Sequence, residues 1–266
     1  MMIKNWDKVK VYDLSINTSH LTPPWPTYEP LQVKFFKRLA PNGANGMLIT
    51  TSNHVGTHLD GPLHFDTAGR DIASLEMDKL VGPGVVVDLS DITEDWSIYT
   101  PEHIMERVEV KKGDIIFINT GYHKYGFDQP EADERRYMLR HPGPSLDFIP
   151  WLKEMEIKYI AVDCGSADHP MNTKIRDWEP QEAEACDAYM RERYGKGLNE
   201  IYPWPDVYQG MHIQLFPQPD EIIHVECIGG EIDKVLNKRL ILGTFPWKFQ
   251  YGESAFCRCV AFEEVD

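Results

Sequence analysis

The pattern of hydrophobic and polar positions predicts a chain that is rich in strands at both ends and alternates helices with strands in its middle. Residues 84–89, 114–121 and 159–163 form near-continuous apolar runs, which are typical of strands buried on both faces. Further strands are expected at 9–14, 31–39, 47–52, 222–226 and 257–262, and helices at 72–80, from Thr100, at 144–155 and at 180–194.

This order of elements predicts a mixed α/β protein, because helix–strand alternation is typical of sheets that are covered by helices. The sequence contains no internal repeat, low-complexity tract or evident linker, so residues 1–266 are expected to form a single domain. Residues 171–210 combine one polar helix with a segment rich in proline and aromatic residues, and we interpret them as an insertion.

The excess of acidic over basic residues argues against nucleic acids and anionic membranes as partners. The chain has 42 acidic and 27 basic residues and a formal net charge of −15, whereas nucleic acids and anionic membranes select a cationic surface. It has neither a signal-peptide core at its start nor a run of about 20 apolar residues. Its five cysteines are odd in number and scattered, which is typical of reduced cysteines in a cytoplasmic protein. We therefore expect a cytoplasmic protein that acts on a small molecule.

The highest density of potential metal ligands lies between residues 54 and 64. His54, His58, Asp60 and His64 stand at even spacing, so an extended segment directs all four to one side, and turns at the intervening glycines would curl them around a point. Imidazole nitrogen and carboxylate oxygen suit Zn²⁺, Mn²⁺ or Fe²⁺, and burying such a set is costly unless an ion holds it together. The motif therefore predicts a metal site.

A metal at this position predicts hydrolytic chemistry, because a bound divalent ion lowers the pKa of water toward about 7 and polarises a carbonyl. His64 is the best candidate for the base, since imidazole exchanges protons near neutral pH. His212 and Glu226 are candidates to complete the shell, while His224 shares the strand face of Glu226 and His169 follows a buried strand, so both remain rivals. The remaining histidines lie in polar or turn contexts and are expected to be solvated: His20, His103, His123 and His141.

The motif also resembles that of a known family. The run from Gly56 to His64, with His54 just ahead of it, is similar to the pattern of the cyclase-like metal-dependent hydrolases, which include bacterial kynurenine formamidase and isatin hydrolase. Further resemblance lies in Asp13-Leu14-Ser15, in Pro24-Trp25-Pro26 and in the late pair His212 and Glu226. The extra length, mostly in residues 171–210, and the segments 229–233 and 245–249 resemble the longer, isatin-hydrolase-type members.

The resemblance implies a swivelling β/β/α fold that assembles as a homodimer or homotetramer, with one or two Zn²⁺ or Mn²⁺ ions. It implies that His54, His58 and Asp60 are metal ligands and that His64 is the catalytic histidine. It further implies that His212 and Glu226 complete the metal site or assist proton transfer.

The expected function is therefore that of a metal-dependent amidohydrolase, which opens a small cyclic amide, imide or lactone through metal-activated water. Hydrolysis of N-formylkynurenine is the alternative within this class. Outside it, His58, Asp60 and His212 could form the Fe(II) face of an oxygenase, or the metal could belong to a non-catalytic binding protein. Trp25 and Phe65 are candidates to line an apolar substrate slot.

Overall fold

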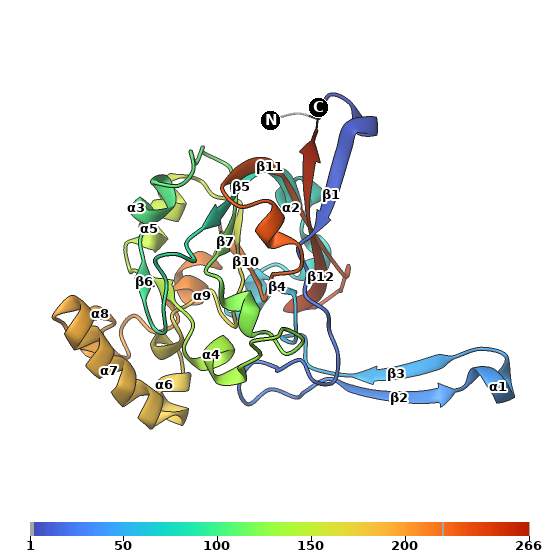
Figure 1. Cartoon of the computed structure of the whole chain (residues 1–266), viewed down its shortest axis with the longest axis horizontal. Coiled ribbons are helices and arrows are strands. Elements are labelled where there is room, and N and C mark those ends of the chain that lie inside the picture. Colours follow the sequence, from blue (N-terminus) through green and yellow to red (C-terminus); the bar gives the residue numbers. More distant parts are fainter. Residues whose placement is uncertain (1–2, 220, 266) are drawn as a thin grey trace.

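An eight-stranded mixed sheet forms the centre of the molecule (Figure 1). The computed structural model describes residues 3–219 and 221–265. The strands of the sheet are β1 (Val9–Asp13), β4 (His58–Asp60), β5 (Val81–Asp88), β7 (Ile115–Asn119), β9 (Tyr159–Val162), β10 (Ile223–Glu226), β11 (Lys238–Pro246) and β12 (Ser254–Glu264). Their order is β1-β12-β11-β5-β7-β9-β10-β4, and β12 also pairs with β4. Seven strands therefore close into a barrel-like sheet, and β1 extends it on the outside of β12.

The three predicted buried strands are the parallel centre of this sheet. β5 pairs with β7, β7 with β9, and β9 with β10, all in parallel, and every residue of β7 and β9 is buried. Alternate side chains enter two cores: Ile116 and Ile118 pack under the helices, whereas Ile115 and Phe117 fill the interior of the barrel. Fully burying one such side chain contributes about 1.5–3 kcal/mol, so these continuous apolar runs stabilise both layers at once.

Short helices cover one side of the sheet and its periphery (Figure 1). The α-helices are α2 (Met77–Leu80), α3 (Pro101–Met105), α4 (Glu134–Leu139), α5 (Phe148–Glu154), α6 (Ile175–Trp178), α7 (Pro180–Tyr194), α8 (Leu198–Ile201) and α9 (Gly210–Leu215). The 3-10 helices are Trp6–Lys8, Pro62–His64, Ile72–Ser74, Tyr122–Tyr125, Pro170–Asn172 and Ile232–Lys234. No helix in residues 3–219 and 221–265 is long and apolar enough to cross a membrane.

Two helix predictions differ from the structure. The segment 72–80 forms two short pieces instead of one helix, because Leu75 and Glu76 are extended and the Asp71 side chain caps the first piece through Ser74 N. The helix expected from residue 144 begins at Phe148, because Gly143–Pro144 forms strand β8 and pairs with β6 (Ile98–Tyr99). By contrast, α7 has the predicted bounds, and Gly195 ends it with a φ of 70°.

A two-stranded hairpin projects from the body of the molecule (Figure 1). It consists of β2 (Gln32–Lys37), the short helix α1 (Leu39–Asn42) and β3 (Gly46–Thr50), and we call residues 32–50 the arm. The arm confirms the strands predicted at 31–39 and 47–52. Residues 24–28 enter its base and residues 52–55 leave it, and the latter run directly into the histidine motif.

Candidate active site

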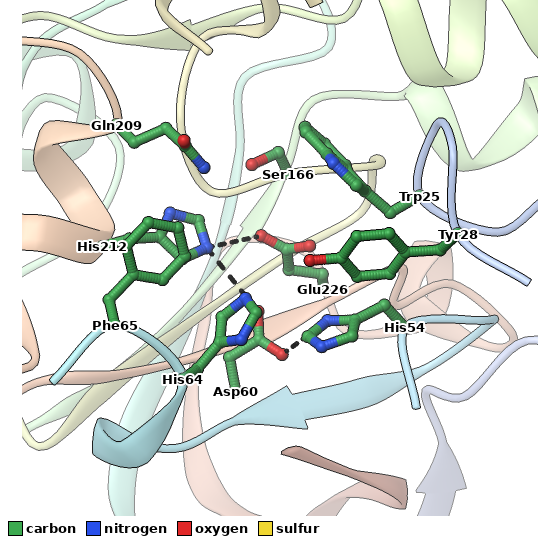
Figure 2. A pocket seen from close by; sticks show the side chains of 10 residues that line it. All are labelled: Trp25, Tyr28, His54, Asp60, His64, Phe65, Ser166, Gln209, His212 and Glu226. Atoms are coloured by element: carbon green, nitrogen blue, oxygen red, sulfur yellow. Dashed lines mark ion pairs between the residues drawn. The ribbon is translucent and has the colours of Figure 1, made fainter. Parts of the chain in front are cut away.

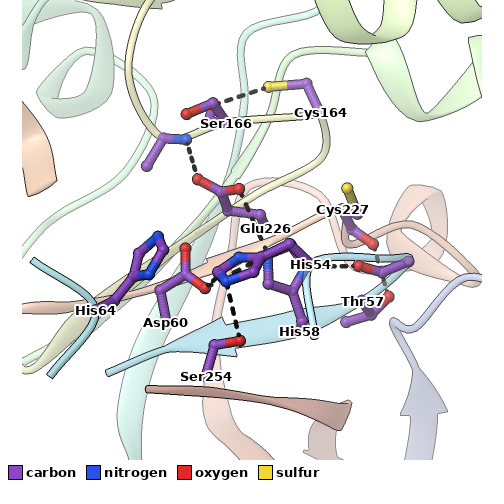
Figure 3. Close-up of polar contacts among 12 residues, drawn as sticks. His54, Thr57, His58, Asp60, His64, Cys164, Ser166, Glu226, Cys227 and Ser254 are labelled. Atoms are coloured by element: carbon purple, nitrogen blue, oxygen red, sulfur yellow. Dashed lines mark hydrogen bonds and ion pairs between the residues drawn. The ribbon is translucent and has the colours of Figure 1, made fainter. Parts of the chain in front are cut away.

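Pairing of β4 with β10 brings the first motif beside the late glutamate. His58 lies opposite Glu226, and Asp60 lies opposite His224. Directly opposed residues of antiparallel strands project from the same face, so all four side chains point to one side of the sheet. The predicted neighbourhood of the motif and Glu226 is therefore a consequence of strand register (Figure 3).

The Gly56-Thr57 turn fixes how the motif enters β4. Gly56 has a φ of 68°, and a Cβ at this position would lie 2.6 Å from Thr18 Oγ1, so the turn requires glycine. The Thr57 hydroxyl donates to the carbonyl of Cys227 at 2.6 Å and accepts from Ile16 N at 3.0 Å (Figure 3). Thr57 thereby ties the motif to the segment that follows β10.

The histidines of the motif converge on Asp60. His54 Nδ1 lies 3.1 Å and His58 Nε2 lies 3.5 Å from Asp60 Oδ1. The 3-10 helix Pro62–His64 turns the chain back, which places the His64 ring 4.4 Å from the His54 ring between centroids. His212, from α9, completes the group, because its Nε2 lies 3.6 Å from both Asp60 Oδ2 and Glu226 Oε1 (Figure 2).

Hydrogen bonds to three of these histidines direct one ring nitrogen of each toward Asp60 and Glu226. His58 donates from Nδ1 to the Gly56 carbonyl at 2.8 Å, and His212 donates from Nδ1 to Asp168 Oδ2 at 2.6 Å, so both rings present Nε2. His54 donates from Nε2 to Glu253 Oε2 at 2.9 Å and presents Nδ1. Such partners are typical of metal-binding histidines, whose second nitrogen is held by a carboxylate or carbonyl.

The donor set fits one or two divalent ions. Ligand atoms of His54, Asp60 and His64 lie within 4.8 Å of one another, as do those of His58, Asp60 and Glu226. Asp60 is 1% exposed, and within the described part of the chain neither of its carboxylate oxygens has a hydrogen-bond partner. Since buried polar atoms nearly always form hydrogen bonds, a buried carboxylate that forms none and belongs to two groups of potential ligands is what a cation site requires.

The electrostatics of the site also favour positive charge. Burial opposes the charged form of His54, but Asp60 and Glu253 outweigh it and raise the pKa of His54 to about 10. Burial, reinforced by Asp60, raises the pKa of Glu226 to about 8. Burial lowers the pKa of His58 to about 4, which keeps this ring neutral, as a ligand must be.

A pocket opens beside this cluster (Figure 2). Trp25 and Phe65, the predicted slot residues, both line it, and so does Tyr28, which the sequence did not single out. The other lining residues are His54, Asp60, His64, Ser166, Gln209, His212 and Glu226. Its mixed lining of aromatic and polar side chains suits a small substrate with one aromatic face.

Four other histidines that the sequence analysis considered do not line the pocket. His169 is buried and donates to the Trp96 carbonyl at 3.0 Å, so it lies outside the pocket, whereas His224 packs 4.9 Å from the His212 ring between centroids. The expectation that His123 and His141 are solvated was wrong. His123 contacts Asp163 at 3.0 Å, and His141 is fully buried, with its Nδ1 2.9 Å from the Pro142 carbonyl.

Sequence reasoning missed two carboxylates that contact the site histidines. Asp168 accepts a hydrogen bond from His212. It follows a buried parallel strand, a position where site residues of α/β proteins gather. The same position made His169 a candidate, so it also indicated the adjacent Asp168. Glu253 Oε2 lies 2.9 Å from His54 Nε2 and 2.8 Å from His64 Nδ1. No local pattern marks Glu253, because it reaches the motif only through the pairing of β12 with β4.

Replacing Asp168 by asparagine is expected to weaken metal binding about 10- to 100-fold, the usual effect of losing a carboxylate behind a ligand histidine. The amide would donate to His212 Nδ1 and force the proton onto Nε2, the nitrogen that faces Asp60. Competition with a chelator measures the affinity. The exposed Asp177→Asn variant is the control, and equal affinities of the two variants would contradict the role of Asp168.

Replacing Glu253 by glutamine is expected to lower kcat about 10- to 100-fold. The neutral amide forms weaker hydrogen bonds with His54 and His64 than the carboxylate, whose Oε2 contacts both rings. Glu253 is a positioning residue, so the midpoint of thermal unfolding should stay near that of wild type. The exposed Glu192→Gln variant serves as the control. A parallel fall in thermal stability, with kcat unchanged, would show that Glu253 only supports the fold.

The fold of the chain is similar to that of several solved structures. Isatin hydrolase A from Ralstonia solanacearum superposes with a TM-score of 0.72 at 19% identity, over 97% of this chain and 93% of that one. Residues 12–169 match the family model named Cyclase, described as "Putative cyclase". The chain belongs to the cyclase family.

Curated relatives agree with this membership. "Cyclase-like protein 1" of Arabidopsis thaliana is 32% identical over 67% of this chain and 73% of its own length. "Kynurenine formamidase" of Bacillus thuringiensis (strain Al Hakam) is 30% identical over 47% of this chain. In that comparison the chain spans about half of the relative, 54% of its length. The mixed α/β fold expected from the sequence and the family resemblance are thereby confirmed.

Proposed function

We propose that the protein is a metal-dependent amidohydrolase that opens a small cyclic amide, imide or lactone of the isatin type. The observation that carries this proposal is Asp60, a buried carboxylate that forms no hydrogen bond within the described residues and belongs to both groups of potential metal ligands. A pocket with aromatic walls adjoins it. Isatin hydrolase A, whose printed name gives its substrate, shares the fold.

The roles of the metal ligands are part of the proposal. His54, His58 and Asp60 would hold the ion, and His212 and Glu226 would complete the site. Asp60 belongs to both ligand groups, which supports one or two ions, and the imidazole and carboxylate donors suit Zn²⁺ or Mn²⁺. When bound, such an ion lowers the pKa of water toward about 7 and polarises a carbonyl.

Proton transfer is assigned to side chains of the chain itself. His64 Nδ1 lies 2.8 Å from Glu253 Oε2, so a proton on Nδ1 is held there and Nε2 is left to accept a proton from water. The same nitrogen can then donate it to the leaving nitrogen or oxygen, while Glu226 assists from the opposite wall. Trp25 and Phe65 would orient the flat ring of the substrate.

A hydrolysis screen tests this function. Isatin, N-formylkynurenine, hydantoins, imides and lactones are offered to protein loaded separately with Zn²⁺ and with Mn²⁺. Opening of isatin or a related cyclic amide is the expected result. Hydrolysis of N-formylkynurenine alone would support the alternative that the Bacillus relative favours, and inactivity on every substrate with either metal would overturn the proposal.

Two functions of other classes have weaker support. An Fe(II) oxygenase face of His58, Asp60 and His212 would leave His54 and His64 without a role, although both converge on the same site. Oxygen uptake with Fe(II) would favour that function. A non-catalytic metal site would be closed on all sides, whereas a pocket adjoins this one.

The proposed enzyme acts in the cytoplasm as a homodimer or homotetramer, as the family resemblance implies. Its five cysteines have no disulfide partner in the described residues, and the sequence shows no pairing pattern. The substrate is a small molecule, and the acidic composition supports neither a nucleic-acid nor a membrane partner.

A further inference from the structure

A short turn carries two aromatic side chains to the pocket. Trp25 N donates to the His54 carbonyl at 3.0 Å, and Tyr28 N donates to the Trp25 carbonyl at 2.9 Å. Pro24 also forms an isolated β-bridge with Val55, so the turn is attached to the start of the histidine motif. Both Trp25 and Tyr28 line the pocket. The position of Tyr28 is therefore fixed relative to His54.

Thr27, the residue before Tyr28, has an unfavourable backbone conformation. Its φ is 75°, in the left-handed region that a β-branched residue rarely adopts. Such a conformation persists only where the surrounding structure imposes it, and it is most frequent at active sites and ligand-binding sites. Because this outlier lies directly beside a pocket residue, it supports a functional role for the turn.

The Tyr28 hydroxyl is a hydrogen-bond donor at the mouth of the pocket. Its ring lies edge-on to the His54 ring, with 5.1 Å between centroids, and Figure 2 shows its hydroxyl pointing into the pocket. Tyr28 is 38% exposed, so an entering substrate can reach it. Within residues 3–219 and 221–265 the hydroxyl forms no hydrogen bond. A phenol keeps its proton at neutral pH, so this group is ready to donate to an oxygen of a bound molecule.

The other residues of the pocket make neutral donors important. Hydrolysis places negative charge on the carbonyl oxygen, and enzymes stabilise that charge with donors held in place around it. Among the described residues, those that line the pocket include no lysine or arginine, and its neutral donors are Tyr28, Ser166 and Gln209. Ser166 is 3% exposed, and its hydroxyl oxygen already accepts from Asp168 N at 3.2 Å. Tyr28 is the most exposed of the three, and its ring contacts His54, a proposed metal ligand.

We infer that the Tyr28 hydroxyl donates a hydrogen bond to the oxygen of the scissile carbonyl and stabilises the oxyanion that forms there; this inference rests on the proposed function. A water oxygen adds to the carbonyl carbon, a proton of the water passes to His64 Nε2, and the π electron pair moves onto the oxygen that Tyr28 binds. When this pair returns, the bond to the leaving nitrogen or oxygen breaks, and the leaving atom takes the proton from His64. Tyr28 keeps its own proton throughout.

Replacing Tyr28 by phenylalanine tests this role, because the change removes the hydroxyl and keeps the ring beside His54. On whichever cyclic amide, imide or lactone the wild type opens, kcat should fall about 10²- to 10³-fold, the usual effect of losing one oxyanion donor, while KM changes less than about threefold. Metal content and the midpoint of thermal unfolding should stay near those of wild type. Tyr251→Phe removes a hydroxyl from a residue that is 82% exposed and outside the pocket, and this control should keep the wild-type kcat.

A substrate with sulfur in place of the carbonyl oxygen identifies the atom that Tyr28 contacts. Sulfur is a weak hydrogen-bond acceptor, so a thiocarbonyl analogue of the same substrate gains little from the hydroxyl. Tyr28→Phe should therefore lower kcat on this analogue by less than about tenfold. Equal losses on the oxygen and sulfur substrates, or an unchanged kcat on the oxygen substrate, would overturn the inference. A loss of kcat in Ser166→Ala alone would assign the oxyanion to Ser166.

A binding measurement separates this inference from the proposed function. A benzo-fused cyclic phosphonamidate carries a tetrahedral anionic oxygen in place of the carbonyl, and its calorimetric titration into metal-loaded protein needs no turnover. Tyr28→Phe should raise its Kd at least about tenfold, and Tyr251→Phe should leave it unchanged. Such a difference in a protein that hydrolyses no substrate would contradict the proposed function but support the hydrogen bond from Tyr28. Absence of binding to wild type, or equal dissociation constants of wild type and Tyr28→Phe, would overturn the inference even in an active enzyme.

Discussion

Replacing His64 by alanine is expected to lower kcat about 10²- to 10⁴-fold, the usual contribution of a positioned general acid–base group. The residue lines the pocket, its Nδ1 lies 2.8 Å from Glu253, and its other nitrogen is left for proton transfer. The metal content should stay near that of wild type, because His54, His58, Asp60, His212 and Glu226 all remain. Steady-state hydrolysis and elemental analysis of the same preparation measure the two quantities.

The exposed His20→Ala variant is the control for this experiment, since it removes an imidazole that belongs to neither ligand group. Loss of the metal in the His64→Ala variant would have a different meaning. His64 belongs to the group with His54 and Asp60 whose ligand atoms lie within 4.8 Å of one another. If the alanine variant loses its metal together with its activity, His64 is a ligand and the base must be another residue.

The sequence predicted those parts of the fold whose signal is local. The runs that became β5, β7 and β9 are apolar throughout because both faces of each strand are buried in this structure. The motif from His54 to His64 was recognisable because its glycine turns and its ligands lie within eleven consecutive residues. The pattern of one short segment was therefore sufficient to predict that these histidines and Asp60 lie close together.

The parts that depend on contacts between distant segments were not predictable in this way. β11 (Lys238–Pro246) lies between β12 and β5, yet its first two residues are charged and it contains Gly243, so its sequence does not read as a buried strand. The charged end is tolerated because Lys238 pairs with Glu263 at 2.7 Å and Arg239 pairs with Asp114 at 2.6 Å. These partners, like Glu253 at the site, are distant in the sequence.

Replacing Asp60 by asparagine is expected to abolish tight metal binding and to lower kcat/KM at least about 10³-fold, since a bound ion supplies several kcal/mol of transition-state stabilisation. Asp60 is the one residue common to both ligand groups, so its loss weakens both at once. Asparagine has nearly the same shape, and it removes a buried negative charge whose oxygens have no hydrogen-bond partner in the described chain. The charge of Asp60 raises the pKa of His54, and the neighbouring histidines hold the pKa of Asp60 well below its usual range, so the metal-free variant should be less stable than metal-free wild type.

Thermal unfolding with and without added Zn²⁺ or Mn²⁺ separates binding from folding. A ligand that binds only the folded state raises its stability by RT ln(1 + [L]/Kd), so wild type should melt at a higher temperature with metal and Asp60→Asn should not. Asp177→Asn, an exposed carboxylate outside the site, should respond as wild type does. A full metal-dependent shift in the Asp60→Asn variant would mean that the cation binds elsewhere. In that case, the contacts of three histidines with Asp60 would form an ion-pair network inside the core and would have no role in metal binding.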